Sequence, residues 1–145
     1  MKSRMKCMIQ RVRLVLMACE CAELSLQYVE DGWTQPQDAI SAAKQWAGSD
    51  GISIEDVKHY AKKAAEHSVA YGYSAFAETA SAAFYAATAV YSDDPLESAR
   101  RVIDSTAFAN RDETLKKCAV ISEKYGYRIW VSADPFKRIK LEELK

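Results

Sequence analysis

The feature that most constrains this fold is an alanine-rich segment in the middle of the chain, residues 75–90. The segment contains eight alanines, and Glu78 is its only ionisable group apart from Tyr85. A helix that is apolar on nearly all sides must be enclosed by other helices. The sequence therefore predicts an all-α fold, a compact bundle of about six helices around a buried central helix at roughly residues 74–91.

The length and composition indicate one domain. The chain has 145 residues, with only 5 glycines and 3 prolines, so long linkers are not expected. We predict a single helical domain over residues 1–145, with flexible ends at 1–6 and 137–145. The formal net charge of zero argues against a nucleic-acid binder, because such proteins carry a clear basic excess.

The first residues have some features of an export signal. Basic residues precede a short apolar run, Leu14–Cys19. That run is shorter than the ~7–15 apolar residues that a signal sequence needs, and no segment approaches transmembrane length. We therefore expect a cytoplasmic protein that does not insert into a membrane.

The four cysteines do not have the spacing of a metal site. They are Cys7, Cys19, Cys21 and Cys118. On a helix, Cys19 and Cys21 point about 200° apart, at ~100° per residue, so they cannot bind one ion together. Free cysteine also behaves as a small core hydrophobe. We expect reduced thiols, no metal and no cofactor.

The first helix is predicted at about residues 5–30. Its apolar residues follow a 4-3 spacing from Met8 through Val15 and Ala22 to Val29, which is typical of bundles and coiled coils. Other apolar residues, such as Ile9 and Leu16, lie off this seam. The pattern leaves two interpretations: the helix is central in the bundle, or it forms the contact of a homo-oligomer.

Capping patterns mark the starts of further helices. They are Thr34 with Gln37, Ser53 with Asp56, Asp94 with Glu97, and Asn110 with Glu113. Asp94 is the strongest, because Pro95 then takes the first helical position.

Glycines mark two expected helix ends, at Gly72 and Gly126. After Gly126, the aromatic and β-branched residues 127–131 predict a short extended strap across the bundle. Asp134 and Pro135 would start a last short helix.

Three side chains are candidates for a pocket between helices: His67, Glu78 and Tyr85. A buried, ionised Glu78 would be unusual and therefore functionally interesting. Ser81, Tyr85 and Thr88 fall on the same helix side, which favours a thin exposed strip instead. No nucleophile is paired with His59 or His67, the two histidines of the chain, and we assign no catalytic residue.

Five residues are candidate contacts for another protein. They are Trp33, Asp93, Arg100, Trp130 and Phe136. Exposed aromatic residues beside charged ones are the usual anchors of protein interfaces.

The segment Gln37–Gly48 contains the pattern A-I-x-A-A-x-x-W. An alanine-rich helix follows that carries A-x-H, with His67 as its histidine. Over residues 14–92 the chain resembles a bacterial family of small alanine-rich helical proteins, the Imm5-like immunity proteins. Phe84–Val90 stand where that family has a further helix with a histidine. The resemblance implies a non-catalytic protein that binds and blocks another protein, such as a toxin or a nuclease of a defence system.

Three functional hypotheses follow. The first is a cytoplasmic binding module of the immunity or inhibitor type. The second is a phage-encoded inhibitor of a bacterial defence system, which would show the same sequence features. The third is a small helical enzyme or ligand-binding protein with a pocket between its helices.

Overall fold

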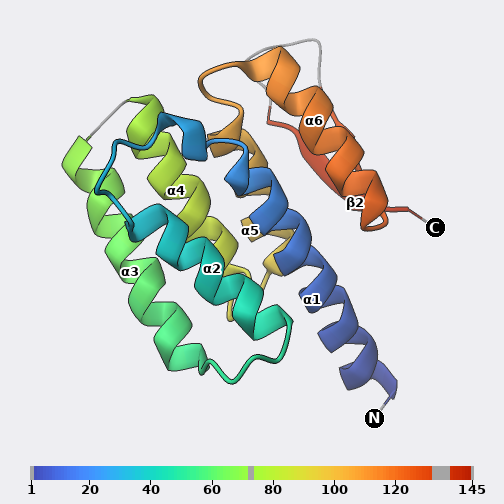
Figure 1. The fold of residues 1–145 in the computed structure, drawn as a ribbon. Helices are drawn as coiled ribbons and strands as arrows, with labels where there is room; N and C mark the ends of the chain where they lie inside the picture. Colours follow the sequence, from blue (N-terminus) through green and yellow to red (C-terminus); the bar gives the residue numbers. More distant parts are fainter. Residues whose placement is uncertain (1, 72–73, 132–137, 145) are drawn as a thin grey trace.

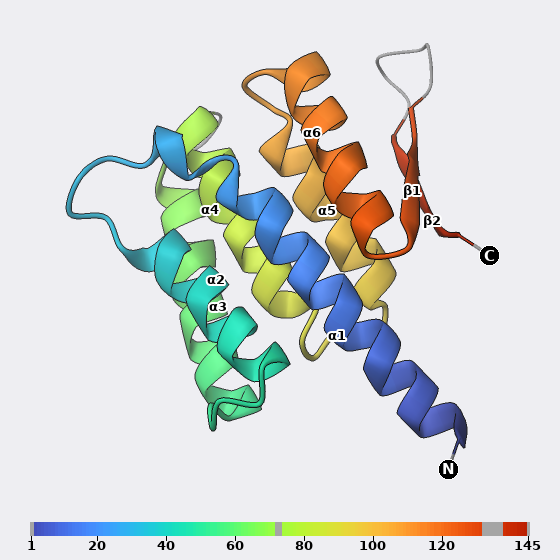
Figure 2. The same ribbon diagram turned by 45° about the vertical axis from the view of Figure 1, so that its right-hand side comes forward.

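The computed structural model describes residues 2–71, 74–131 and 138–144. In these residues, six α-helices form a bundle with a two-stranded sheet at one side, as Figures 1 and 2 show. The elements are α1 (Lys2–Glu23), η1 (Leu26–Tyr28, a 3-10 turn), α2 (Gln35–Ala47), α3 (Ile54–Tyr71), α4 (Ala75–Thr88), α5 (Pro95–Thr106), α6 (Arg111–Lys124), β1 (Tyr127–Trp130) and β2 (Lys140–Glu143). The predicted all-α architecture is confirmed.

Helix α4 lies in the middle of the bundle and packs against α1, α2, α3 and α5. Ala80, Ala82, Ala83, Ala86 and Ala87 are fully buried. Small side chains on several sides of one helix let four neighbours approach it together. The alanine-rich segment is thus the buried centre of the fold, as the sequence predicted.

Helix α1 is shorter than predicted, because it ends at Glu23 and not near residue 30. The buried Ser25 hydroxyl donates a hydrogen bond to the Ala22 carbonyl at 2.8 Å, and the chain continues as the turn η1. Val15 and Ala22 of the predicted seam are fully buried, whereas Met8 is half exposed. The N-terminal turns of α1 extend beyond the other helices (Figure 2).

Two of the four predicted caps form through their side chains. Ser53 accepts a hydrogen bond from the Asp56 amide, and Asp94 accepts one from the Glu97 amide. Thr34 and Asn110 precede α2 and α6 without a side-chain cap. Ser74 caps α4, which we did not predict. Gly126 takes a positive φ of 89° after α6, as expected, whereas Gly72 lies outside the described residues.

The end of the chain differs from the flexible tail that we predicted. Residues 127–130 are extended, as expected, but they pair with Lys140–Glu143 in an antiparallel sheet. Ile139 and Leu141 are buried, and burying these two side chains on the bundle stabilises the pairing. The helix start proposed at Asp134 lies outside the described residues.

None of the helices in the described ranges combines the length and the hydropathy that crossing a bilayer requires.

Candidate functional site

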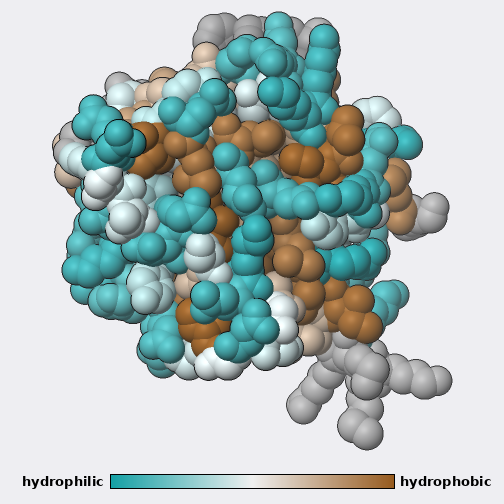
Figure 3. All heavy atoms as spheres, viewed as in Figure 1, coloured by the Kyte–Doolittle hydropathy of each residue, from teal (hydrophilic) through white to brown (hydrophobic). Residues whose placement is uncertain are grey.

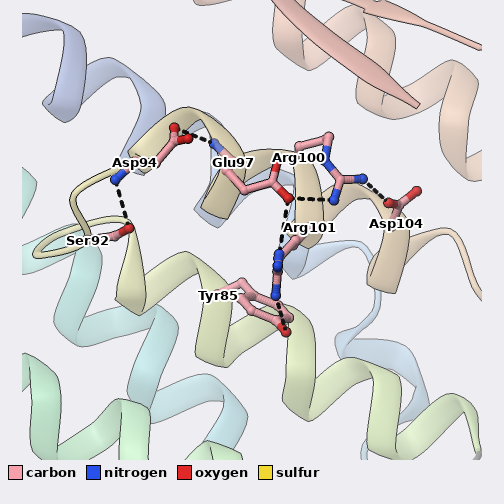
Figure 4. A network of polar contacts seen from close by, with 7 residues as sticks. All are labelled: Tyr85, Ser92, Asp94, Glu97, Arg100, Arg101 and Asp104. Atoms are coloured by element: carbon pink, nitrogen blue, oxygen red, sulfur yellow. Dashed lines mark hydrogen bonds and ion pairs between the residues drawn. The ribbon is translucent and has the colours of Figure 1, made fainter. Parts of the chain in front are cut away.

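A network of charged side chains runs along one side of α5 (Figure 4). Arg100 donates two hydrogen bonds to the Glu97 carboxylate, at 2.8 and 2.7 Å, and a third to Asp104. Residues three and four positions apart on a helix are neighbours, so this spacing places a carboxylate on each side of Arg100. Arg100 is buried, and its two carboxylate partners hold its guanidinium in one orientation.

Arg101 connects this network to α4. Its Nε donates to Glu97 at 3.2 Å, and its Nη1 donates to the Tyr85 hydroxyl, also at 3.2 Å. Its guanidinium carbon lies 5.4 Å from the centroid of the Tyr85 ring, within the range of a cation–π contact. Arg101 remains half exposed, so the network presents an oriented guanidinium to solvent.

The electrostatics follow from these contacts. Hydrogen bonds from Arg100, and then from Arg101, lower the pKa of Glu97 to about 2, although partial burial opposes this shift. The Glu97 carboxylate in turn raises the pKa of Arg100. Glu97 and Arg100 therefore both stay charged across the physiological pH range.

Glu78 lies on α4, near the same α4–α5 contact. The Ser105 hydroxyl of α5 donates a hydrogen bond to it, but burial dominates and raises the pKa of Glu78. Glu78, Ser81, Tyr85 and Thr88 are all half-buried. The side of α4 that we predicted to be exposed is thus partly shielded from solvent.

A shallow hollow of about 240 Å³ opens beside the network. Its walls are Tyr85 from α4, Arg100, Arg101, Asp104 and Ser105 from α5, and Arg138 just before β2. Three arginines from two separate parts of the chain therefore surround one concave surface.

Trp130 is the last residue of β1, in the hairpin that β1 forms with β2. Its cross-strand neighbour is Lys140, two residues after Arg138. The Trp130 side chain is 49% exposed, and the Arg128 guanidinium carbon lies 5.7 Å from its ring centroid. We call Tyr85, Arg101, Arg138 and Trp130 the arginine–aromatic surface.

The other predicted contact residues lie elsewhere. Asp93 is exposed in the α4–α5 loop and lines a second hollow, of about 290 Å³, between that loop, α1 and the hairpin. Phe136 lies outside the described residues. Trp33 is half-buried against α3 and α4, with its ring centroid 3.9 Å from that of His67 and 4.8 Å from that of Phe76.

The three pocket candidates divide between two places. Glu78 and Tyr85 lie along the α4–α5 contact, whereas His67 packs in the aromatic cluster with Trp33 and Phe76. Burial in this cluster lowers the pKa of His67. His67 therefore does not share a site with the other two.

Sequence reasoning missed Arg101 and Arg138. The spacing of Arg101, four residues after Glu97, was a usable signal for the ion pair. Nothing local marks Arg138, because pairing of the two strands brings it to α5.

Among the described residues, no group of three or more His, Cys, Asp or Glu side chains is arranged to hold a metal ion. Comparison of the chain with protein-family models, with curated proteins and with solved structures found no match.

Proposed function

We propose that this chain is a non-catalytic protein-binding module that covers a surface of a partner protein. The observation that carries the proposal is the arginine–aromatic surface. Tyr85, Arg101 and Trp130 belong to the residue types that dominate binding energy at protein interfaces. The network on α5 fixes Arg101 before binding, so less conformational entropy is lost on association.

The charge of this surface favours an acidic partner. Arg138 is exposed beside the hollow, and Arg128 and Lys140 lie on the exposed face of the hairpin. Glu97 and Asp104 are engaged by Arg100 and Arg101. Complementary charge on the partner would speed association and help to select the right partner.

The proposed mode of action is inhibition by occlusion, as in an immunity protein that blocks a toxin. The resemblance of residues 14–92 to the Imm5-like proteins supports this mode. A phage-encoded inhibitor of a defence nuclease would act in the same way. In either case the proposed location is the cytoplasm, where thiols stay reduced.

The test is a capture experiment with the tagged chain and two variants. Trp130→Ala removes the exposed aromatic side chain of the surface. Phe108→Ala is the matched control, because Phe108 is 48% exposed two residues after α5 ends and is not part of the arginine–aromatic surface. We expect a protein captured by the wild-type chain and by Phe108→Ala to be lost with Trp130→Ala. Equal capture by all three chains would contradict the proposal.

A second candidate is self-association through α1. Met8 and Ile9 are 52% and 55% exposed on the turns that extend beyond the bundle. Sedimentation of the wild-type chain as a dimer, and of an Ile9→Glu variant as a monomer, would support this candidate. A monomeric wild-type chain at high concentration would exclude it.

A further inference from the structure

We propose that the hollow between α4, α5 and the start of β2 binds a phosphate-type oxyanion. This site goes beyond the proposed partner surface, because a free anion would occupy it without any partner protein. The argument rests on the hydrogen-bond donors around the hollow, on their charge and on the separate elements that supply them.

Several hydrogen-bond donors around the hollow have no acceptor within the described part of the protein. An arginine carries five N–H donors. Arg101 uses its Nε and Nη1 for Glu97 and Tyr85, which leaves its Nη2 group available. Within the described part of the chain, Arg138 makes no ion pair or hydrogen bond. The Tyr85 hydroxyl accepts from Arg101, so its own proton can be donated to a ligand.

The charges around the hollow leave a positive excess. Arg100 forms ion pairs with Asp104 and Glu97, and Glu97 also forms an ion pair with Arg101. Arg138 adds a positive charge that no described carboxylate pairs with. Asp104 is the acidic residue on the wall, and Arg100 holds its carboxylate in an ion pair. The residues that line the hollow thus carry three positive charges and one negative charge, whereas Glu97 and Glu78, which contact lining residues, do not line it themselves. An anion that enters the hollow therefore meets mainly positive charge at its walls.

The arrangement of the donors favours phosphate over carboxylate. A carboxylate is planar and matches the fork of one guanidinium, as Glu97 does on Arg100. Around the hollow, the donors come from three separate elements: Tyr85 on α4, Arg101 on α5 and Arg138 before β2. A phosphate group has three strong acceptor oxygens that point in different directions, so each donor group can reach one of them.

The test is a titration of the purified chain with inorganic phosphate at constant ionic strength, followed by amide chemical shifts in NMR spectra. We expect saturable shifts at Tyr85, Arg101 and Ser105. Arg138→Gln should weaken binding about tenfold or more, since a hydrogen bond to a charged group contributes about 1.5–3 kcal/mol. Arg128→Gln is the matched control, because Arg128 is an exposed arginine on the same hairpin that does not line the hollow.

Two results would overturn the proposal. One is a linear, unsaturable response, and the other is an equal loss of binding in Arg138→Gln and Arg128→Gln, which would indicate general surface charge. Acetate at the same concentration should produce much smaller shifts, and equal shifts would also reject a phosphate site. Thermal unfolding of both variants checks that each is folded.

A further titration identifies the source of the anion. Tighter binding of O-phosphoserine than of inorganic phosphate would point to a phosphorylated residue, whereas equal or weaker binding would point to the free ion. Trp130→Ala should still bind phosphate, because Trp130 does not line the hollow. Loss of partner capture with phosphate binding intact therefore separates the two proposals.

Discussion

The guanidinium of Arg11 on α1 donates a hydrogen bond to the main-chain carbonyl of Ala89, at 3.0 Å. The same group also donates to the carbonyls of Val90 and Ser92, at 3.3 and 2.7 Å. These residues form the C-cap of α4 and the turn after it, because the helix itself ends at Thr88. Main-chain carbonyls that are shielded from water need a hydrogen-bond donor. Arg11 thus satisfies carbonyls of the turn that follows the central helix α4 and ties this turn to α1.

Replacing Arg11 with Met should destabilise the protein by about 1–3 kcal/mol, because it leaves partly buried carbonyls without their charged donor. Methionine keeps most of the apolar stem, so the change reports mainly on the hydrogen bonds. Urea unfolding followed by circular dichroism measures the effect. Arg128→Met is the control and should change the free energy of unfolding by less than about 0.5 kcal/mol. Equal midpoints for the two variants would show that this contact contributes little.

Ala86→Leu should destabilise the fold by about 1–3 kcal/mol or more. Ala86 is fully buried on α4, and added methylene groups in a well-packed core force neighbouring side chains and helices to shift. The matched control is Ala70→Leu, at an exposed position of α3. Thermal unfolding should show a clear fall in Tm for Ala86→Leu only. A stable Ala86→Leu protein would mean that the bundle is loosely packed around α4.

Acid should weaken the α5 network through Glu97. The pKa of this group is about 2 in the folded protein, below its usual 4.5, so its contribution to stability is present above pH 4.5 and is lost as the pH falls toward 2. Urea midpoints measured between pH 6 and pH 2.5 should fall less steeply for Glu97→Gln than for the wild-type chain. Because Glu97 is partly exposed, we expect a modest effect. Glu142→Gln, at an exposed position of β2, is the control for loss of one charge. If the urea midpoints of the wild-type chain and of Glu97→Gln fell in parallel with pH, the lowered pKa of Glu97 would be contradicted.

The two tryptophans that we selected as candidate contacts should behave differently. Trp33 packs edge-on against His67 and Phe76, so Trp33→Ala should destabilise the protein by about 1–3 kcal/mol, less than for a fully buried tryptophan. Trp130 is half exposed, and Trp130→Ala should leave Tm almost unchanged. Calorimetry of both variants makes the comparison. A large loss of stability in Trp130→Ala would mean that the Trp130 side chain contributes to folding stability.

The cysteines should react at two very different rates. Cys7 is exposed, whereas Cys19, Cys21 and Cys118 are fully buried. Burial raises the pKa of Cys19 to about 12, and a hydrogen bond with Cys118, together with burial, raises that of Cys21. A thiol reagent at pH 7.5 should therefore modify one cysteine quickly in the folded protein and all four after denaturation. Rapid modification of a second thiol would show that the core opens readily.

Much of the fold was predictable because its determinants are local. The burial of α4 follows from its apolar circumference, and the caps at Ser53 and Asp94 follow from side chains that reach their own backbone. The predicted cap at Thr34 failed because that residue adopts helical backbone angles, φ −94° and ψ −13°, rather than the extended ones a capping side chain needs. The early end of α1 depends on Ser25, which is buried by the neighbouring helices.

The sequence by itself determined that this chain forms a helical bundle, because periodicity and apolar composition select the helix and require its burial. Only the tertiary structure decided which surface is available for function. Arg101 meets Tyr85 because α4 and α5 pack together, and Arg138 reaches them because β2 pairs with β1. Contacts between distant segments depend on how whole elements are placed, and no local pattern encodes that placement.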